Sequence, residues 1–141
     1  MGKPTVNTTT GEEGDAEAFI PGSEYNFCFL PTPDYCAPSH DDISRGVKWI
    51  QEHQAAGQTV YVHCNAGRGR SAVIVLCFLI ANKGISSDEA LEYLRSKRGV
   101  SNLKRCCGTR PQWRSVLKYE RCGSLPRPLA SRRCPPPPAT A

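Results

Sequence analysis

The segment His63-Cys64-Asn65-Ala66-Gly67-Arg68-Gly69-Arg70-Ser71 decides the fold, because it joins two apolar stretches of different kinds. Residues 59–62 before it are β-branched or aromatic and contain no turn former, which predicts a short buried strand. Residues 71–80 after it are almost wholly apolar and too long for a buried strand, so they predict a helix. The arrangement is strand, loop, helix, the repeating unit of an α/β sheet.

The loop between the strand and the helix has the features of an oxyanion site. A loop that closes onto a helix N-terminus directs unpaired backbone N–H groups inward, and the helix dipole adds partial positive charge. Gly67 and Gly69 can take a positive φ and place no Cβ near a bound anion. We therefore expect phosphate to bind to the loop and to the first helical side chain, that is, to Asn65, Ala66, Gly67, Arg68, Gly69 and Arg70.

Four side chains in and beside this loop predict nucleophilic chemistry. Cys64 lies at the base of the loop, where helix N–H groups and Arg70 should lower the pKa of its thiol. The planar guanidinium of Arg70 can hold two phosphate oxygens, which lysine cannot do. Ser71 can donate a hydrogen bond to the sulfur, and His63, on the strand, should face away and orient the nucleophile. These residues together predict covalent catalysis on a phosphoryl group.

The motif His63-Cys64-x5-Arg70-Ser71 resembles the signature of the cysteine-dependent protein tyrosine phosphatases, and Ala66-Gly67-Arg68 resembles their dual-specificity branch. Together with Leu30-Pro31-Thr32-Pro33-Asp34-Tyr35, it is similar to the mitochondrial-type lipid phosphatases that act on phosphatidylglycerophosphate. The likeness runs from about residue 27 to about residue 119. One position departs from that subfamily, which usually has lysine where this chain has Asn65, so one positive charge at the loop is missing.

Hydrolysis needs a proton donor for the leaving group, and a carboxylic acid on a loop is the usual one. Asp34 is our candidate, since it lies in a proline-punctuated loop after an expected strand over residues 26–30, and the resemblance implies the general acid there. Without the resemblance, an aspartate after proline is more often a turn residue. Asp41 and Asp42 are the alternatives, but they stand at an expected helix start, where acidic residues are common.

The remaining pattern predicts one small α/β domain over residues 25–122. Ile43, Val47 and Ile50 recur at helical spacing, with Gly57 closing that helix. The sequence Ser86-Ser87-Asp88-Glu89 is a capping box, and a further helix should start after Pro111. The fold class we expect is therefore α/β, with a small, mostly parallel phosphatase-type sheet flanked by helices.

The two ends of the chain carry little pattern. Residues 1–24 are rich in Thr, Gly and Glu and have almost no apolar periodicity, so we expect a disordered or atypical segment. The sheet would then lack the amino-terminal strands usual in the resembled family. Residues 123–141 end in Pro135-Pro136-Pro137-Pro138 and predict a proline-rich disordered tail.

The eight cysteines do not suggest a metal or disulfide framework. Nothing resembles a secretory signal, and Cys106 and Cys107 are adjacent rather than spaced as a chelate. We expect reduced thiols, no metal and no cofactor. The resemblance implies an intracellular protein, cytoplasmic or associated with a mitochondrial membrane.

Charge divides the chain into two halves. Residues 1–58 hold nine acidic and three basic residues, whereas residues 95–133 hold twelve basic residues and one acidic residue. The basic half is compatible with peripheral contact with an anionic membrane, although solvated helix faces are the simpler account. We expect no nucleic-acid partner, since aromatic and basic residues do not interleave, and we expect a monomer.

The sequence therefore predicts a metal-independent phosphomonoester hydrolase that works through a cysteinyl-phosphate intermediate. The resemblance implies a phospholipid substrate such as phosphatidylglycerophosphate. Two alternatives stay open: a dual-specificity phosphatase acting on phosphoproteins, and a catalytically weak phosphate-binding protein.

Overall fold

The computed structural model describes residues 4–9, 27–65, 68–99 and 111–123. Within them, three strands form one sheet: β1 (Thr5–Asn7), β2 (Phe27–Phe29) and β3 (Tyr61–His63). The strand order is β2-β1-β3, and both pairings are parallel. The expected small, mostly parallel α/β sheet is confirmed.

The strand registers bring three chain segments to one edge of the sheet. Asn7 is level with Phe29 on one side and with His63 on the other. The chain continues past this edge with backbone hydrogen bonds from Leu30 N to the Asn7 oxygen and from Thr8 N to the His63 oxygen. Ligands of open parallel sheets bind beyond the carboxyl ends of the strands, so this edge is where a site is expected.

The central strand, β1, was not foreseen. Residues 1–24 were expected to be disordered or atypical, yet Thr5–Asn7 is a buried strand paired on both sides. Val6 is its only apolar residue, and a strand of three residues is too short to show a period. The polar side chains are satisfied locally, since the Asn7 Oδ1 accepts from both the N–H and the hydroxyl of Thr9. The domain boundary near residue 25 itself stays a prediction.

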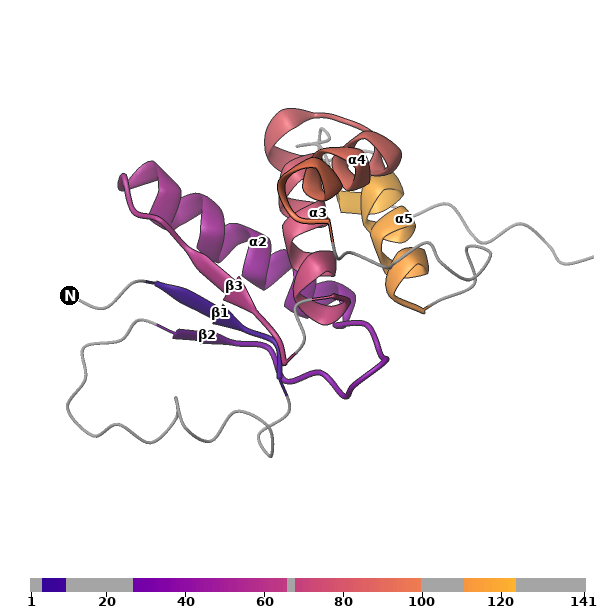
Figure 1. Cartoon of the computed structure of the whole chain (residues 1–141). Coiled ribbons are helices and arrows are strands. Elements are labelled where there is room, and N and C mark those ends of the chain that lie inside the picture. Colours follow the sequence, from indigo (N-terminus) through magenta and orange to yellow (C-terminus); the bar gives the residue numbers. More distant parts are fainter. Residues whose placement is uncertain (1–3, 10–26, 66–67, 100–110, 124–141) are drawn as a thin grey trace, which may run out of the picture.

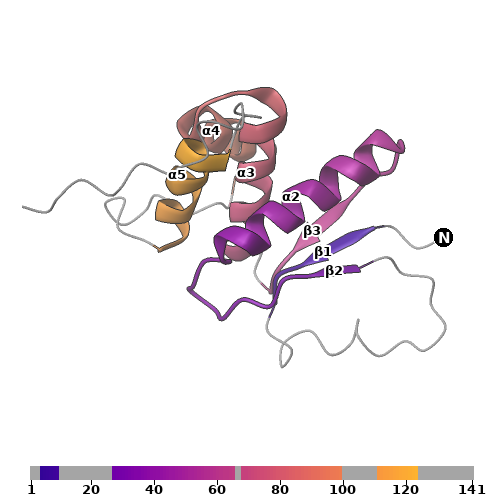
Figure 2. The same ribbon diagram turned by 180° about the vertical axis from the view of Figure 1, so that it is seen from behind.

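Helices cover one face of this sheet (Figures 1 and 2). They are α2 (His40–Ala55), α3 (Arg70–Lys83), α4 (Ser87–Lys97) and α5 (Pro111–Gly123). The helix α2 runs beside β3, and α3 packs against α2, α4 and α5. The predicted strand, loop and helix around Cys64 are confirmed, with β3 shifted slightly along the chain and α3 extended to Lys83.

The core forms around α3, which is apolar on nearly all sides because it has neighbours on several faces. Val73, Ile74, Leu76 and Cys77 are completely buried there. The apolar stripe that the sequence predicted on α2 is buried as well. The sheet, the residue after β2, and the helices α4 and α5 supply the others, so that these further core residues are Val6, Cys28, Leu30, Ile43, Val47, Ile50, Ala90, Leu91, Trp113, Val116 and Tyr119. Burial raises the pKa of the Cys77 thiol, and mainly burial raises the pKa of Tyr119 to about 12.

The helix ends agree with the sequence signals. Ser39 caps α2, with its hydroxyl accepting from the Asp42 N–H, and Gly57 takes a positive φ just beyond the helix. The predicted capping box of α4 is present, because Ser86 and Glu89 bond each other's backbone N–H groups. The hydrogen bonds that the Glu89 carboxylate accepts from the Ser86 N–H and, secondly, from the Ser86 hydroxyl lower the pKa of that carboxyl. Among the described residues, no single helix is long and apolar enough to cross a membrane; only the bent pair α3 and α4 together passes that test by length and composition.

Candidate active site

Cys64 directly follows β3, at the edge of the sheet where the three strands end. Its side chain is buried, and Sγ lies 3.2 Å from the hydroxyl oxygen of Ser71, the second residue of α3. The strand fixes the sulfur and the helix fixes the hydroxyl, so the contact follows from the two elements that the sequence predicted. A hydroxyl at this distance can donate a hydrogen bond to a thiolate.

Arg70 begins α3, and its side chain is only 3% exposed although it is charged. Its Nη1 donates to the backbone oxygen of Thr32 at 3.0 Å, and its Nη2 lies 3.3 Å from the Asp34 Oδ1. A buried guanidinium needs such partners, because leaving its N–H groups unsatisfied would be costly. The structure therefore brings Arg70 and Asp34 together across thirty-six positions of sequence.

The segment from residue 31 to residue 39 carries Asp34 and can be called the acid loop. Thr32 is buried and its hydroxyl donates to the Leu30 oxygen, while the Cys36 N–H donates to the Pro33 oxygen. Asp34 is about half exposed, and its Oδ1 also accepts from the Tyr35 N–H. Tyr35 has a φ of 61°, unusual for a residue with a Cβ, and is 81% exposed. The loop thus has a turn at the acid and a buried anchor on its amino-terminal side.

The alternative carboxylates lie elsewhere. Asp41 and Asp42 are in the first turn of α2, as a helix start would place them, and Asp42 forms an ion pair with Arg45 at 3.1 Å. Asp34, by contrast, forms an ion pair with Arg70. The geometry therefore favours Asp34 as the acid.

His63 is the last residue of β3 and is half-buried. Its ring stacks on the ring of Tyr61, with centroids 5.2 Å apart, so it shares the face of β3 that carries Tyr61. Alternation along a strand puts Cys64 on the other side. The backbone oxygen of His63 accepts two hydrogen bonds from Thr8, at 2.9 Å from the hydroxyl and 3.1 Å from the N–H. An orienting role for His63 stays a prediction.

The predicted phosphate loop is described in part. Asn65 and Arg68 are exposed and Gly69 is half-buried, while Ala66 and Gly67 lie outside the described residues. Gly69 does not use the freedom to take a positive φ, since its φ is −132°. The missing Cβ leaves room for Gln112, because a Cβ at this position would lie 2.6 Å from its Nε2 and would force that amide to shift.

Two contributors to the site were missed from the sequence. Thr32 supplies the backbone oxygen that accepts from Arg70, and Gln112, from the first turn of α5, lies against Gly69 and donates to the Cys36 oxygen at 3.1 Å. Backbone acceptors leave no mark in a sequence. A glutamine after a helix-starting proline carries no signal by itself, since its partners are distant along the chain.

The cysteines differ in part from expectation. Cys28, Cys36, Cys64 and Cys77 are thiols, but Cys122 is disulfide-bonded, so the expectation that all eight are reduced is wrong there. Burial raises the pKa of the Cys28 thiol, opposed in part by Arg45. Within the described ranges, no group of three or more His, Cys, Asp or Glu is placed to hold a metal ion.

The fold and this cluster of side chains are those of a cysteine-dependent phosphatase, and the family comparison agrees. Residues 5–122 match the family described as dual specificity phosphatase, catalytic domain, and the chain belongs to that family. The matched region includes β1, the strand that the sequence pattern did not reveal.

Among curated proteins, the chain is similar to phosphatidylglycerophosphate phosphatases. It is 38% identical over 109 residues to "Phosphatidylglycerophosphate phosphatase PTPMT1" of Arabidopsis thaliana, which covers 73% of this chain and 31% of that protein. It is 37% identical over 81 residues to "Phosphatidylglycerophosphatase and protein-tyrosine phosphatase 1" of Homo sapiens, covering 57% of this chain and 37% of the relative. The chain thus spans about a third of the length of these relatives.

Solved structures show the same fold. A crystal structure of PTPMT1 superposes with a TM-score of 0.64 at 29% identity, covering 84% of this chain and 75% of that one. A structure of PTPMT1 in complex with PI(5)P gives a TM-score of 0.70 at 24% identity, covering 84% and 76% of the two chains. At 24% identity, the likeness to the structure with PI(5)P shows a shared fold and no more.

Proposed function

We propose that this chain is a metal-independent phosphomonoester hydrolase that uses Cys64 as its nucleophile. The observation that supports it most is the convergence of four side chains from three segments: the Cys64 sulfur 3.2 Å from Ser71, and Arg70 3.3 Å from Asp34. Each matches one role that the reaction needs: nucleophile, thiolate partner, phosphate ligand and proton donor. Membership of the dual-specificity phosphatase family supports the same assignment.

The reaction would proceed in two displacements at phosphorus. In the first, the Cys64 thiolate attacks, the bond from phosphorus to the ester oxygen breaks, and Asp34 gives its proton to that oxygen. In the second, Asp34 takes a proton from water, which attacks the cysteinyl phosphate, and the thiolate leaves with the Ser71 hydroxyl beside it. Atoms and charge balance with water as the only co-reactant.

Charge on the equatorial phosphate oxygens would be stabilised by Arg70 and by the N–H groups at the start of α3. Arg70 is held in a nearly water-free position, where its interaction with a phosphoryl group is stronger than in bulk solvent. The contacts with Thr32 and Asp34 engage one N–H on Nη1 and one on Nη2 of a guanidinium that carries five, so a bound phosphoryl group would share Arg70 with the acid loop.

The substrate class that we propose is a phospholipid such as phosphatidylglycerophosphate. The names of the Arabidopsis and human relatives support this. The resemblance of residues 30–35 to the same lipid phosphatases, stated in the sequence analysis, supports it too. A dual-specificity activity on phosphoproteins is the second candidate. It is favoured by the neutral, exposed Asn65 beside the nucleophile and by 31% identity over 77 residues to "Dual specificity protein phosphatase 1" of Homo sapiens.

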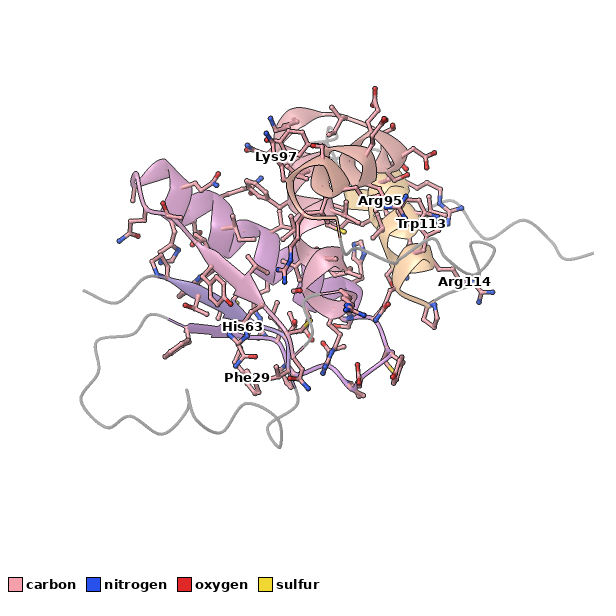
Figure 3. All side chains as sticks on the ribbon, viewed as in Figure 1. Phe29, His63, Arg95, Lys97, Trp113 and Arg114 are labelled. Carbon is pink, nitrogen blue, oxygen red and sulfur yellow. The ribbon has the colours of Figure 1, made fainter. Side chains whose placement is uncertain are left out.

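Peripheral contact with an anionic membrane remains part of the proposal, but the cations of α4 lie too far from the site to bind the same membrane surface as the substrate. Figure 3 labels Arg95 and Lys97 at the end of the molecule away from His63 and Phe29, which mark the edge of the sheet where the site lies. Arg68, an exposed cation of the phosphate loop itself, is better placed to meet anionic headgroups. Binding to anionic vesicles should then weaken as salt rises and in an Arg68→Ala variant.

A substrate panel tests the function. Purified protein should release phosphate from phosphatidylglycerophosphate vesicles faster than from phosphotyrosine or phosphoserine peptides. Asn65→Lys should increase the lipid rate more than the peptide rate. Peptide turnover that exceeds lipid turnover, without salt-sensitive vesicle binding, would transfer the assignment to the second candidate.

The control is Cys64→Ser, which should lose turnover while still binding vanadate, because Arg70 and the helix N–H groups remain. If the unmodified chain bound vanadate but released no phosphate from any substrate, it would be a phosphate-binding protein instead. Localisation, cytoplasmic or at a mitochondrial membrane, and the monomeric state stay predictions from the resemblance, to be checked by imaging the tagged protein and by sedimentation.

A further inference from the structure

Gln112 occupies an unusual position for a polar side chain. It is the second residue of α5 and is 7% exposed. Its Nε2 donates to the backbone oxygen of Cys36 at 3.1 Å, which joins residues 76 positions apart. Cys36 follows Asp34 by two residues, so this bond holds the acid loop on the carboxyl-terminal side of the acid.

The same carboxamide also lies on the phosphate loop. A Cβ added to Gly69 would meet the Nε2, Oε1 and Cδ of Gln112 at 2.6, 2.8 and 2.9 Å. Contacts this short show that the flat amide group rests directly on the Gly69 backbone, with no room for a side chain between them. Gly69 is in turn the N-cap of α3, where its oxygen accepts from the Val73 N–H at 3.0 Å. One side chain therefore spans the acid loop and the start of the phosphate-binding helix.

The support beneath Gln112 is rigid. Trp113, Val116 and Tyr119 on α5 are buried in the core, and α5 packs along α3. A helix fixed in this way holds the first atoms of its side chains in place, and burial limits the rotamers of the rest. The amide of Gln112 is thus a fixed point to which the acid loop is attached.

This attachment differs from the other link between the two loops. Arg70 also holds the acid loop, through the Thr32 oxygen and the Asp34 carboxylate, but the same guanidinium is the proposed phosphate ligand. Substrate would therefore share Arg70 with the acid loop, so this link depends on whether phosphate is bound. The amide of Gln112 points at Cys36 and is neutral, so its bond does not compete with the phosphoryl group.

We propose that Gln112 is a positioning residue that keeps Asp34 at a fixed distance from the phosphate loop while Arg70 is engaged by substrate. This inference rests on the proposed function, because only under that function is Asp34 a general acid. It predicts that Gln112 affects the proton-transfer step rather than phosphate binding. The residue acts through the loop that carries the acid, because its hydrogen bond goes to the Cys36 oxygen.

The kinetic test uses Gln112→Leu, which keeps most of the volume and loses the donor. On substrates with poor, alkyl leaving groups, kcat should fall about tenfold, whereas on aryl phosphates with good leaving groups it should change less than about twofold, since these need little proton donation. KM and vanadate affinity should stay unchanged. Gln51→Leu, on the exposed side of α2, is the matched control and should match the unmodified protein. An equal loss for both kinds of leaving group would show a general structural role and overturn the proposal.

A second measurement does not need catalysis. Amide exchange at Tyr35 and Cys36, followed by nuclear magnetic resonance, should be about fivefold faster in Gln112→Leu, the size expected for the loss of one hydrogen bond. The Ala90 amide in α4 should exchange at an unchanged rate. Unchanged exchange in the acid loop overturns the proposal even if the protein is active. If the unmodified protein hydrolyses no substrate, the proposed function is overturned instead. The amide exchange rates at Tyr35 and Cys36 still decide whether Gln112 holds the acid loop.

A coupling experiment covers the case in which Gln112→Leu does not fold. Gly69→Ala should push the amide of Gln112 away from Cys36, and Gln112→Asn should be one methylene too short to reach it. If both act through the same bond, the rate loss on alkyl phosphates in the double variant should be clearly smaller than the product of the two single losses. Independent, multiplicative losses would contradict a shared contact.

Discussion

Asp34 and Arg70 meet across the site with an Oδ1 to Nη2 distance of 3.3 Å, although one side chain is 54% exposed and the other 3%. The contact joins a solvent-facing acid to a buried cation. A phosphoryl group held by Arg70 would therefore lie within reach of Asp34 without a long movement of the acid loop. Since the carboxylate remains exposed, water and leaving groups can reach it from outside.

Replacing Asp34 with asparagine should separate proton donation from phosphate binding. We expect Asp34→Asn to lower the rate by about 10²–10⁴-fold on alkyl phosphates and far less on aryl phosphates with good leaving groups. The measurement is kcat across a leaving-group series. Asp41→Asn, at the exposed start of α2, serves as the control and should leave the series unchanged. A loss that does not vary with the leaving group would assign the acid to another residue.

The strand, loop and helix around Cys64 could be predicted because the apolar stretches on either side differ in length and in residue type. Capping signals placed α4, and apolar spacing placed α2. The strand β1 could not be predicted, since Thr5–Asn7 owes its position to partners on two other strands rather than to its own composition. Tertiary pairing overrides local propensity most easily in so short an element.

The site likewise divides into residues that the local sequence predicted and residues that only distant contacts place. The residues Cys64, Arg70 and Ser71 are close in sequence and lie at one helix start, so their motif already implied their proximity. Asp34 needed the family resemblance, because an aspartate after proline is ordinary in turns. Gln112 could not be found, since its meaning lies in a hydrogen bond to a backbone oxygen 76 residues away. Gly69 was predicted as a phosphate-loop residue, but its φ is negative, and the neighbour that a Cβ would meet there, Gln112, lies too far along the chain to be foreseen.

Arg70→Lys should impair both binding and turnover. Lysine offers a single ammonium in place of a planar fork, so it cannot bind two phosphate oxygens in parallel or satisfy both Thr32 and Asp34. We expect vanadate affinity to fall at least tenfold and kcat to fall further. The control is Arg45→Lys, at an exposed arginine that pairs with Asp42, which should change vanadate affinity and kcat little. Retention of more than half of the activity in Arg70→Lys would refute the bidentate role.

Ser71→Ala should slow the second displacement more than the first. The hydroxyl lies 3.2 Å from the Cys64 sulfur, where it can stabilise the thiolate as it leaves phosphorus. With an aryl phosphate, whose first step is fast, the variant should accumulate cysteinyl phosphate and show a burst of phenol followed by a slow steady rate. Rapid-quench trapping of the phosphoprotein checks this outcome. A reduced rate without a burst would place the serine in the first step instead.

Gly46 connects the stability of the core to the acid loop. A Cβ on Gly46 would lie 2.8 Å from the Cδ1 of Leu30 and 3.3 Å from the Cγ2 of Ile74, two side chains that are completely buried. Alanine improves helix propensity by about 1 kcal/mol relative to glycine, but inserting a methyl into a filled core costs about 1–3 kcal/mol. Since Leu30 has no solvent-facing side into which to move, we expect the packing cost to prevail.

The unfolding free energy of Gly46→Ala should therefore fall by about 1 kcal/mol, and by no more than about 2 kcal/mol, in urea, with an unchanged slope. Gly99→Ala is the matched control, because a Cβ there meets nothing within 4 Å and the site is exposed; its stability should change by less than about 0.5 kcal/mol. Leu30 leads directly into the acid loop, and its oxygen accepts from Thr32, so the rate on alkyl phosphates should fall as well. If Gly46→Ala were as stable as Gly99→Ala, α2 would have room to shift away from Leu30, and the close packing of helix against acid-loop anchor would not constrain the site.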